Sequence, residues 1–163
     1  MMDETALLKL LEKHADMNTC DLASALNETQ ENILSKLNEL EQNKIILGHH
    51  TLINWDKTNT NRVMALIEVS VMPEREYGYD RIAKLIYRYP EVDTMYLMSG
   101  KSEFIVTVYG KTMQEIANFV GSKLACIDKV TGTCTLFVLK QYKRSGIVFE
   151  AEEDSAERLL VTP

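Results

Sequence analysis

Apolar side chains recur at helical spacing in three successive stretches of the first 45 residues. A cap at Asn18-Thr19 precedes the second stretch, and Asn27 separates the second from the third. The residues predict helices at about 5–12, 21–26 and 29–42. In the third helix, the apolar face consists of Ile33, Leu34, Leu37 and Leu40. This pattern predicts two helices joined by a tight turn, with a first helix packed behind them.

The residues after the third helix change to short apolar runs. Residues 45–47 and 51–53 flank Gly48-His49-His50, so we expect a small hairpin here. Three short helices followed by a hairpin predict a winged helix-turn-helix of about 55 residues.

The second half of the chain alternates between strand-like and helix-like patterns. We expect strands at 63–71, 92–98, 103–109 and 130–139, and helices at 79–89 and 113–124. The order βαββαβ predicts a ferredoxin-like sheet with both helices on one face. The other face would be left open, which favours at least a dimer.

These patterns predict an α+β protein with two domains. The predicted segments are a winged helix-turn-helix domain at 1–55, a linker without apolar residues at 56–61, a βαββαβ domain at 62–145, and an acidic C-terminal tail at 146–163.

Composition narrows the class of protein. No stretch approaches the roughly 18 continuous apolar residues of a membrane span, and the acidic N-terminus is unlike a secretory signal. Cys20, Cys126 and Cys134 are scattered and form no CxxC pair. We therefore expect a cytoplasmic protein without a disulfide framework or a zinc site.

The charge distribution bears on DNA binding. Residues 1–60 hold five lysines against ten acidic residues, residues 61–145 have a net charge of +3, and residues 146–163 have a net charge of −4. A protein that relies on phosphate neutralisation places its basic excess in the part that contacts DNA. Here the candidate DNA-binding part is acidic, so we expect a single copy to bind DNA weakly.

Four segments resemble a known family when they are taken in order and spacing. They are DLASAL, LNELEQNKIILGHHTLINWDK, IYRYPEV and YLMSGKSEFIVTVYGKTMQEI. Together they resemble the leucine-responsive/asparagine-operon (Lrp/AsnC) regulators over roughly residues 3–145. The resemblance implies a transcription regulator that forms a dimer or an octamer, binds double-stranded DNA and senses a free amino acid.

The third helix carries the candidate DNA contacts. Its polar face offers amides and hydroxyls that can read base edges, and the wing adds two basic side chains. The candidates are Thr29, Gln30, Asn32, Ser35 and Lys36, with Lys44 and His49 contacting phosphates. Asn38 and Glu39 stand where the family commonly has arginine. The alternative is a helix that only supports the wing or a protein contact.

The turn around Gly100 carries the candidate effector site. A glycine with positive φ would expose N–H groups to a ligand carboxylate, and Glu103 would face the ammonium of the same amino acid. The candidates are Ser99, Gly100, Lys101, Ser102 and Glu103, with Thr133 and Thr135, and also Thr131, as polar lining. The family commonly has Asp at the position of Glu103. The alternative is an ordinary β-turn.

The sequence gives little support for metal binding, cofactor binding or catalysis. The three histidines lie far from the cysteines, and no phosphate-binding loop or nucleophile-base spacing is present, so we expect no metal, no cofactor and no enzyme. The basic segment 140–146 could contact DNA, pair with the acidic tail or remain solvated. The competing function is an oligomeric amino-acid-binding module with weak or absent DNA binding.

Overall fold

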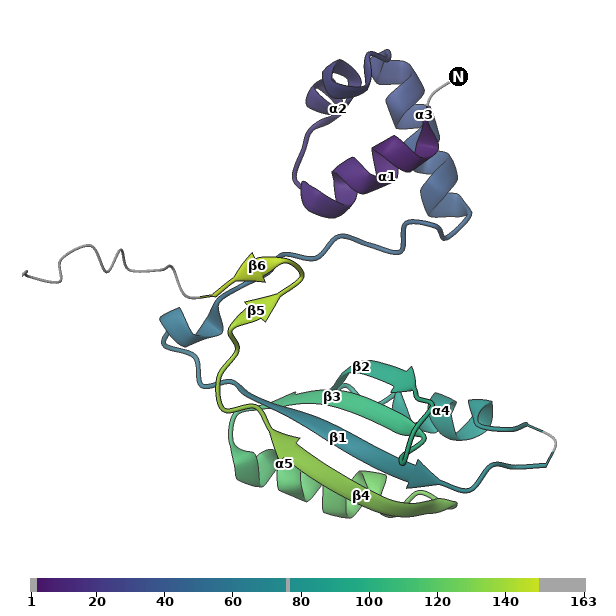
Figure 1. Cartoon of the computed structure of the whole chain (residues 1–163), viewed down its shortest axis with the longest axis vertical. Helices are drawn as coiled ribbons and strands as arrows, with labels where there is room; N and C mark the ends of the chain where they lie inside the picture. Colours follow the sequence, from purple (N-terminus) through teal and green to yellow (C-terminus); the bar gives the residue numbers. More distant parts are fainter. Residues whose placement is uncertain (1–2, 76, 150–163) are drawn as a thin grey trace, which may run out of the picture. The chain divides into compact units, whose positions relative to one another are not determined.

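The computed structural model of the protein describes residues 3–75 and 77–149. The chain divides into two units, with the boundary between Ile53 and Asn54 (Figure 1). None of the helices in the described residues is long and apolar enough to cross a membrane.

Three capped helices form the first unit. They are α1 (Glu4–Lys13), α2 (Thr19–Leu26) and α3 (Gln30–Gln42). The side chains of Asp3, Asn18 and Thr29 each accept a hydrogen bond from a backbone N–H in the first turn. The core of this unit consists of Leu7, Leu11, Leu22, Ala23, Ile33 and Leu40. The three helices predicted from the sequence are thus confirmed.

A left-handed residue forms the turn between α2 and α3. Asn27 has φ 52°, and the N–H of Glu28 donates to the carbonyl of Ala23 at 2.9 Å. This closure ends α2 and lets α3 start two residues later. The tight turn predicted at Asn27 is present.

The hairpin predicted after α3 is wrong. The N–H groups of Ile45 and Ile46 both donate to the carbonyl of Leu40, at 2.9 and 3.2 Å. Lys44, with φ 56°, makes this helix-ending turn possible. Because these amides close the helix, they do not form a strand ladder, and residues 45–53 contain no strand.

Leu34 also departs from its predicted place on the apolar face of α3. Its side chain is 45% exposed, whereas Ile33 and Leu40 are fully buried. Leu34 lies about 100° around the helix from Ile33, so it falls at the edge of the buried face.

A four-stranded antiparallel sheet forms the second unit. Its elements are β1 (Val63–Val71), α4 (Asp80–Ile86), β2 (Val92–Leu97), β3 (Phe104–Gly110), α5 (Met113–Phe119), a π-helical turn η2 (Val120–Leu124) and β4 (Val130–Phe137). The strand order is β2-β3-β1-β4, with β1 in the centre between β3 and β4. Both helices cover one face of this sheet (Figure 1), which confirms the ferredoxin-like prediction.

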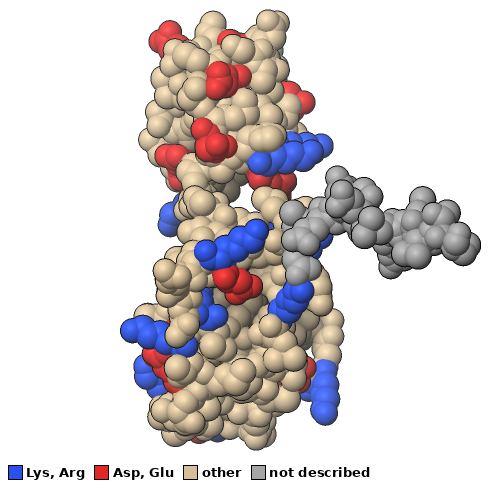
Figure 2. Space-filling model, turned by 90° about the vertical axis from the view of Figure 1, so that its left-hand side faces the viewer, with Lys and Arg blue, Asp and Glu red and all other residues tan. Residues whose placement is uncertain are grey.

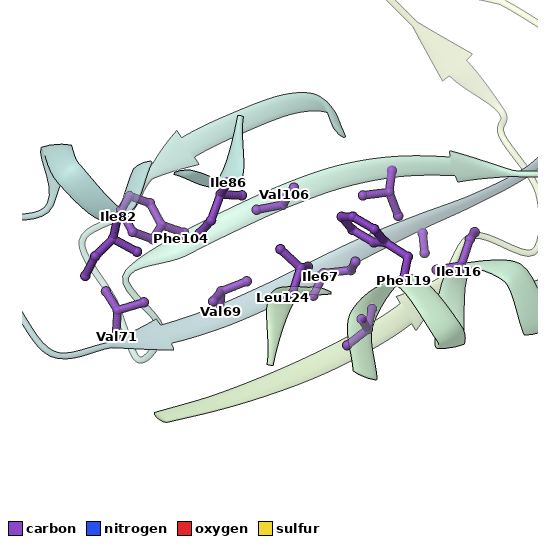
Figure 3. Packing of buried hydrophobic residues seen from close by; sticks show 13 residues of the cluster. Ile67, Val69, Val71, Ile82, Ile86, Phe104, Val106, Ile116, Phe119 and Leu124 are labelled. Carbon is purple, nitrogen blue, oxygen red and sulfur yellow. The ribbon is translucent and has the colours of Figure 1, made fainter. Parts of the chain in front are cut away.

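Strict alternation along β1 places its apolar residues toward the helices. Ala65, Ile67, Val69 and Val71 are buried, and the residues between them face the open side of the sheet. Figure 3 shows this core, in which Ile82 and Ile86 of α4 and Ile116 and Phe119 of α5 meet the strands. Two edge-to-face ring pairs, Tyr79 with Phe104 and Tyr89 with Phe119, complete the packing.

The predicted linker at 56–61 begins inside a short 3-10 helix, η1 (Trp55–Lys57). The Arg62 guanidinium then lies 3.7 Å from the centre of the Tyr109 ring and 5.0 Å from that of Trp55. This stack holds residues 55–62 against the end of β3.

A two-stranded hairpin follows the sheet. It consists of β5 (Lys143–Arg144) and β6 (Ile147–Val148), joined by Ser145 and Gly146, both with positive φ. The guanidinium of Arg144 donates to the Tyr109 hydroxyl at 3.1 Å. The hairpin spans the predicted boundary between the sheet domain, ending at 145, and the tail, beginning at 146. The tail residues 150–163 lie outside the described residues.

Candidate nucleic-acid interface and effector site

Four of the seven predicted DNA-contacting residues lie in the exposed first half of α3. Thr29 caps the helix, while Gln30, Asn32 and Ser35 are exposed. The amide of Gln30 donates to the Thr19 hydroxyl at 2.8 Å, and that of Asn32 donates to Glu28 at 3.0 Å. These bonds fix both amides relative to the turn before α3.

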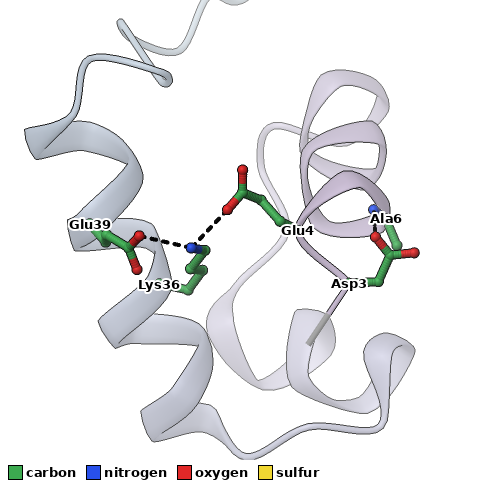
Figure 4. Close-up of polar contacts among 5 residues, drawn as sticks. All are labelled: Asp3, Glu4, Ala6, Lys36 and Glu39. Carbon is green, nitrogen blue, oxygen red and sulfur yellow. Dashed lines mark hydrogen bonds and ion pairs between the residues drawn. The ribbon is translucent and has the colours of Figure 1, made fainter. Parts of the chain in front are cut away.

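Lys36 lies apart from this group, between two carboxylates (Figure 4). Its ammonium is 2.7 Å from Glu4 of α1 and 2.9 Å from Glu39 of α3, and the side chain is only 21% exposed. The hydrogen bonds that Lys36 donates to Glu4 and Glu39 raise its pKa, because both carboxylates stabilise the charged ammonium.

Lys44 and His49, the two candidates from the predicted wing, are exposed beyond the end of α3. Lys44 occupies the left-handed position that ends the helix, and His49 lies in the segment without strands. The structure therefore places Lys44 at the end of α3 and His49 five residues further along the chain, and the hairpin expected to present them is absent from residues 45–53.

The surface of the first unit is dominated by acidic side chains. α3 contains Glu31, Glu39 and Glu41, and Lys36 is its single basic residue. Figure 2 shows acidic groups spread over the visible face of this unit. Acidic side chains therefore outnumber basic ones along α3, which makes this helix unfavourable for a phosphate.

The candidate effector residues 99–103 form the loop between β2 and β3. The N–H of Met98 donates to the carbonyl of Glu103 at 2.8 Å and closes this loop, and Ser99, Gly100 and Lys101 are exposed. Gly100 does not have the positive φ expected of it: among the described glycines only Gly78 and Gly146 do. The turn therefore does not depend on the backbone freedom of this glycine.

Glu103 and Ser102 meet the end of β1. One carboxylate oxygen of Glu103 accepts a hydrogen bond from the N–H of Val71 at 2.8 Å, next to an irregularity in the pairing of β1 with β4. The hydroxyls of Ser102 and Ser70 are 3.4 Å apart, and the Thr131 hydroxyl donates to the carbonyl of Ser70 at 3.1 Å. Ser70 is the residue of this group that sequence reasoning missed, since its position opposite the loop follows only from strand register.

Thr133 and Thr135 do not join this group. They pair with Val69 and Ile67 of β1, so their side chains share the helix-covered face with those residues. The polar cluster at the sheet end therefore consists of residues from the β2–β3 loop, the end of β1 and the start of β4.

A separate hollow lies against the open face of the sheet. Its volume is about 720 Å³, and segment 138–145 borders it. The sheet contributes Met64, Thr94, Tyr96, Thr107 and Tyr109, and the C-terminal segment contributes Lys140, Tyr142, Lys143 and Arg144. Thr107 is only 7% exposed, although it faces this side. The described residues contain no cluster of His, Cys, Asp and Glu suited to a metal ion.

Sequence comparison links the chain to known regulators. The family model of the Lrp/AsnC ligand binding domain matches residues 64–148. The uncharacterised HTH-type transcriptional regulator YugG of Bacillus subtilis is 35% identical over 161 residues, which cover 98% of this chain and 96% of YugG. The regulator LrpA of Pyrococcus abyssi is 26% identical and covers 88% of this chain over its whole length.

Structural comparison agrees with this relationship. A transcriptional regulator of Neisseria meningitidis, solved as a complex with L-methionine, has a TM-score of 0.69 at 22% identity. The match covers 88% of this chain and 94% of that one, so the two share a fold. The family model matches more than half of the chain, and the alignment with YugG covers nearly all of it. This protein therefore belongs to the Lrp/AsnC family and is a helix-turn-helix transcriptional regulator.

Proposed function

We propose that this regulator reads double-stranded DNA with the exposed start of α3 in the major groove. The observation that carries this proposal is the fixed pair of amides at Gln30 and Asn32. Each amide uses one N–H in its hydrogen bond within the protein. The second N–H and the carbonyl oxygen remain, and together they match the hydrogen-bonding edge of adenine. Thr29 adds a hydroxyl at the start of α3 and Ser35 adds another about one turn beyond Asn32, and Lys44 and His49 contact the phosphates.

The regulator acts as an oligomer in this proposal. The open face of the sheet carries apolar side chains from all four strands, among them Leu66, Ile105 and Leu136, with Tyr96 at the edge. A second copy packed on this face would bury them and hold two copies of α3 at a set spacing. A pair of acidic, weakly binding units then gains affinity from being linked.

The effector in this proposal is a free amino acid bound at the loop between β2 and β3. The exposed N–H groups of residues 99–101 would receive the carboxylate, and the second oxygen of Glu103 would receive the ammonium. The methionine complex of the Neisseria regulator supports this ligand class for a protein of the same fold. The effector would shift DNA binding only by as much as it favours one assembly over another.

The cysteines bear on the cellular compartment in which the regulator acts. We expect a cytoplasmic protein, since Cys20, Cys126 and Cys134 are all exposed and unpaired.

The test of DNA reading is selection of bound duplexes from a random library by the full-length oligomer, followed by titration at two salt concentrations. We expect one sequence to be enriched, and its affinity to fall as salt rises. Ser35→Glu should weaken binding about tenfold or more, since it puts a carboxylate in the groove. Ala15→Glu adds the same charge outside α3 and should change binding less than about twofold.

Enrichment of no sequence would overturn the DNA-reading proposal and leave an amino-acid-binding assembly. Equal losses from Ser35→Glu and Ala15→Glu would instead show that α3 is not the reading helix. For the effector, calorimetry with each of the twenty amino acids should give heat of binding for at least one. No heat from any of them would overturn the proposed ligand.

A further inference from the structure

The Lys36 ammonium is the only cation that α3 offers, and it is held by two carboxylates from two helices. Glu4 comes from the first turn of α1, and Glu39 lies three residues after Lys36 on α3 (Figure 4). Both carboxylates remain partly exposed, at 43% for Glu4 and 56% for Glu39, whereas Lys36 is largely covered. The two acids therefore shield the ammonium from the solvent side.

The arrangement resembles the contact that a lysine makes with DNA. A lysine binds a phosphate as a point charge, through short bonds to anionic oxygens. Glu4 and Glu39 supply such oxygens at 2.7 and 2.9 Å, on the flank of the helix proposed to enter the groove.

We infer that Glu4 and Glu39 are specificity-determining residues that occupy the phosphate-binding position of Lys36 and suppress sequence-independent DNA binding. This inference rests on the proposed DNA-reading function. Glu4 and Glu39 engage two of the three N–H donors of Lys36 and offset its charge, so a phosphate that approaches it gains little net attraction. Most of the affinity must then come from base contacts and from assembly.

The charge of the rest of α3 strengthens this effect. Glu31 and Glu41 on the same helix repel phosphates without contacting Lys36. A duplex with the wrong sequence offers only phosphates, so it is rejected. A duplex with the right sequence also makes base contacts with Gln30 and Asn32, and the carboxylates do not block these contacts.

The test compares the double variant Glu4→Gln/Glu39→Gln with a matched control, Glu12→Gln/Glu41→Gln. Each pair removes one acid from α1 and one from α3, and the control acids make no contact with Lys36. The measurement is fluorescence anisotropy with random-sequence duplex DNA over a salt series, on the full-length oligomer. Thermal unfolding of each variant verifies that both units remain folded.

Release of Lys36 should raise the affinity for random DNA about tenfold and steepen the log–log salt slope by about one, the value for one added phosphate contact. The control should raise affinity less and leave the slope unchanged. Adding Lys36→Met to the double variant should restore the original slope. In parallel, acetylation by acetic anhydride should be slower at Lys36 than at Lys44 in the natural protein, and should become comparable in the double variant.

Equal slopes in the double variant and the control would overturn this inference, even where the natural protein binds a selected sequence. A steeper slope in the double variant, together with a sequence selected by the natural protein, supports it. A steeper slope without any selected sequence overturns the proposed DNA reading and the specificity role with it, although Lys36 is then masked as inferred. No DNA binding by any variant, or equal acetylation of Lys36 and Lys44 in the natural protein, would also overturn it.

Discussion

The carboxylate of Glu103 accepts a hydrogen bond from the backbone N–H of Val71 at 2.8 Å, joining the start of β3 to the end of the central strand. Val71 is almost fully buried, so its N–H has no ready access to water. Glu103 therefore has a structural role that is independent of any ligand.

The two roles of Glu103 are separable by substitution. Glu103→Ala should lower the free energy of unfolding by about 1–2 kcal/mol, because the Val71 N–H loses its acceptor. Glu103→Gln keeps a carbonyl oxygen and should unfold nearly as the natural protein does, but it should lose amino-acid binding. Urea denaturation and calorimetry measure the two effects. Equal stability of the Ala and Gln variants would contradict the structural role.

Asn27 should tolerate only residues that adopt its left-handed conformation. Asn27→Ala should destabilise the first unit by about 1 kcal/mol, since alanine adopts the left-handed region at φ 52° less readily than asparagine does. Asn27→Gly should be close to neutral. Thermal unfolding followed by circular dichroism distinguishes the two. A Gly variant as unstable as the Ala variant would show that the Asn side chain, and not its backbone, is what matters.

Gly110 lies where β3 passes close to α5. A Cβ at this position would stand 2.9 Å from Cγ1 of Ile116, a buried core residue. Gly110→Ala should therefore cost about 1–3 kcal/mol in stability. Gly121→Ala is the control, because a Cβ there meets no atom within 4 Å. Unfolding of both variants at the same urea concentration would contradict the expected clash between the new Cβ and Ile116.

Low pH should lower the folding stability of the second unit because it protonates Glu91. The hydrogen bond from Lys123 lowers the pKa of Glu91 below its usual 4.5. A carboxyl with a depressed folded pKa contributes stability above pH 4.5 and loses it as the pH falls through the folded value. Both side chains are partly exposed, so the contribution is small, roughly 0.5 kcal/mol.

Glu91→Gln and Lys123→Met should each remove this part of the pH dependence. Melting temperatures between pH 3 and pH 6 provide the measurement, and the double variant should show no further loss. A natural protein and a Glu91→Gln variant with parallel pH profiles would contradict the assignment.

Substitution on the open sheet face should affect assembly. Leu136 of β4 is 49% exposed on this face, and Leu136→Lys would bury an ammonium between two copies. We expect self-association to weaken about tenfold or more in analytical ultracentrifugation. Leu139→Lys, at a residue just beyond β4 that is 88% exposed, should leave it unchanged. Full assembly of the Leu136→Lys protein would place the interface elsewhere.

The elements of both units could be predicted because each has a regular apolar period. The apolar run from Val63 to Val71 predicted β1 with its observed bounds, and the cap at Asn18-Thr19 marked the start of α2. Leu34 was wrongly assigned to the buried face of α3 because the helical period alone does not define where that face ends. The hairpin failed because Lys44, a lysine in a left-handed position, carries no sequence signal of a helix-ending turn.

The candidate sites were less predictable, since they depend on contacts between distant residues. Nothing in the local sequence links Lys36 to Glu4, 32 positions earlier on another helix. The opposition of Ser70 and Ser102 likewise requires strand register. Residues within one short segment, such as 99–103 or 29–35, lie near one another because the chain itself keeps them together, and their roles stay predictions.

The stack of Arg62 between Trp55 and Tyr109 shortens the tether that joins the two units. With residues 54–62 fixed to the second unit and Ile46 fixed to the end of α3, only about seven residues between them are unattached. Fully extended, seven residues reach about 24 Å. In the proposed dimer, an operator whose two half-sites lay beyond this reach could not be contacted by both copies of α3 at once. The spacing and rotational phase of the half-sites would then limit which operators are bound, independently of any base contact.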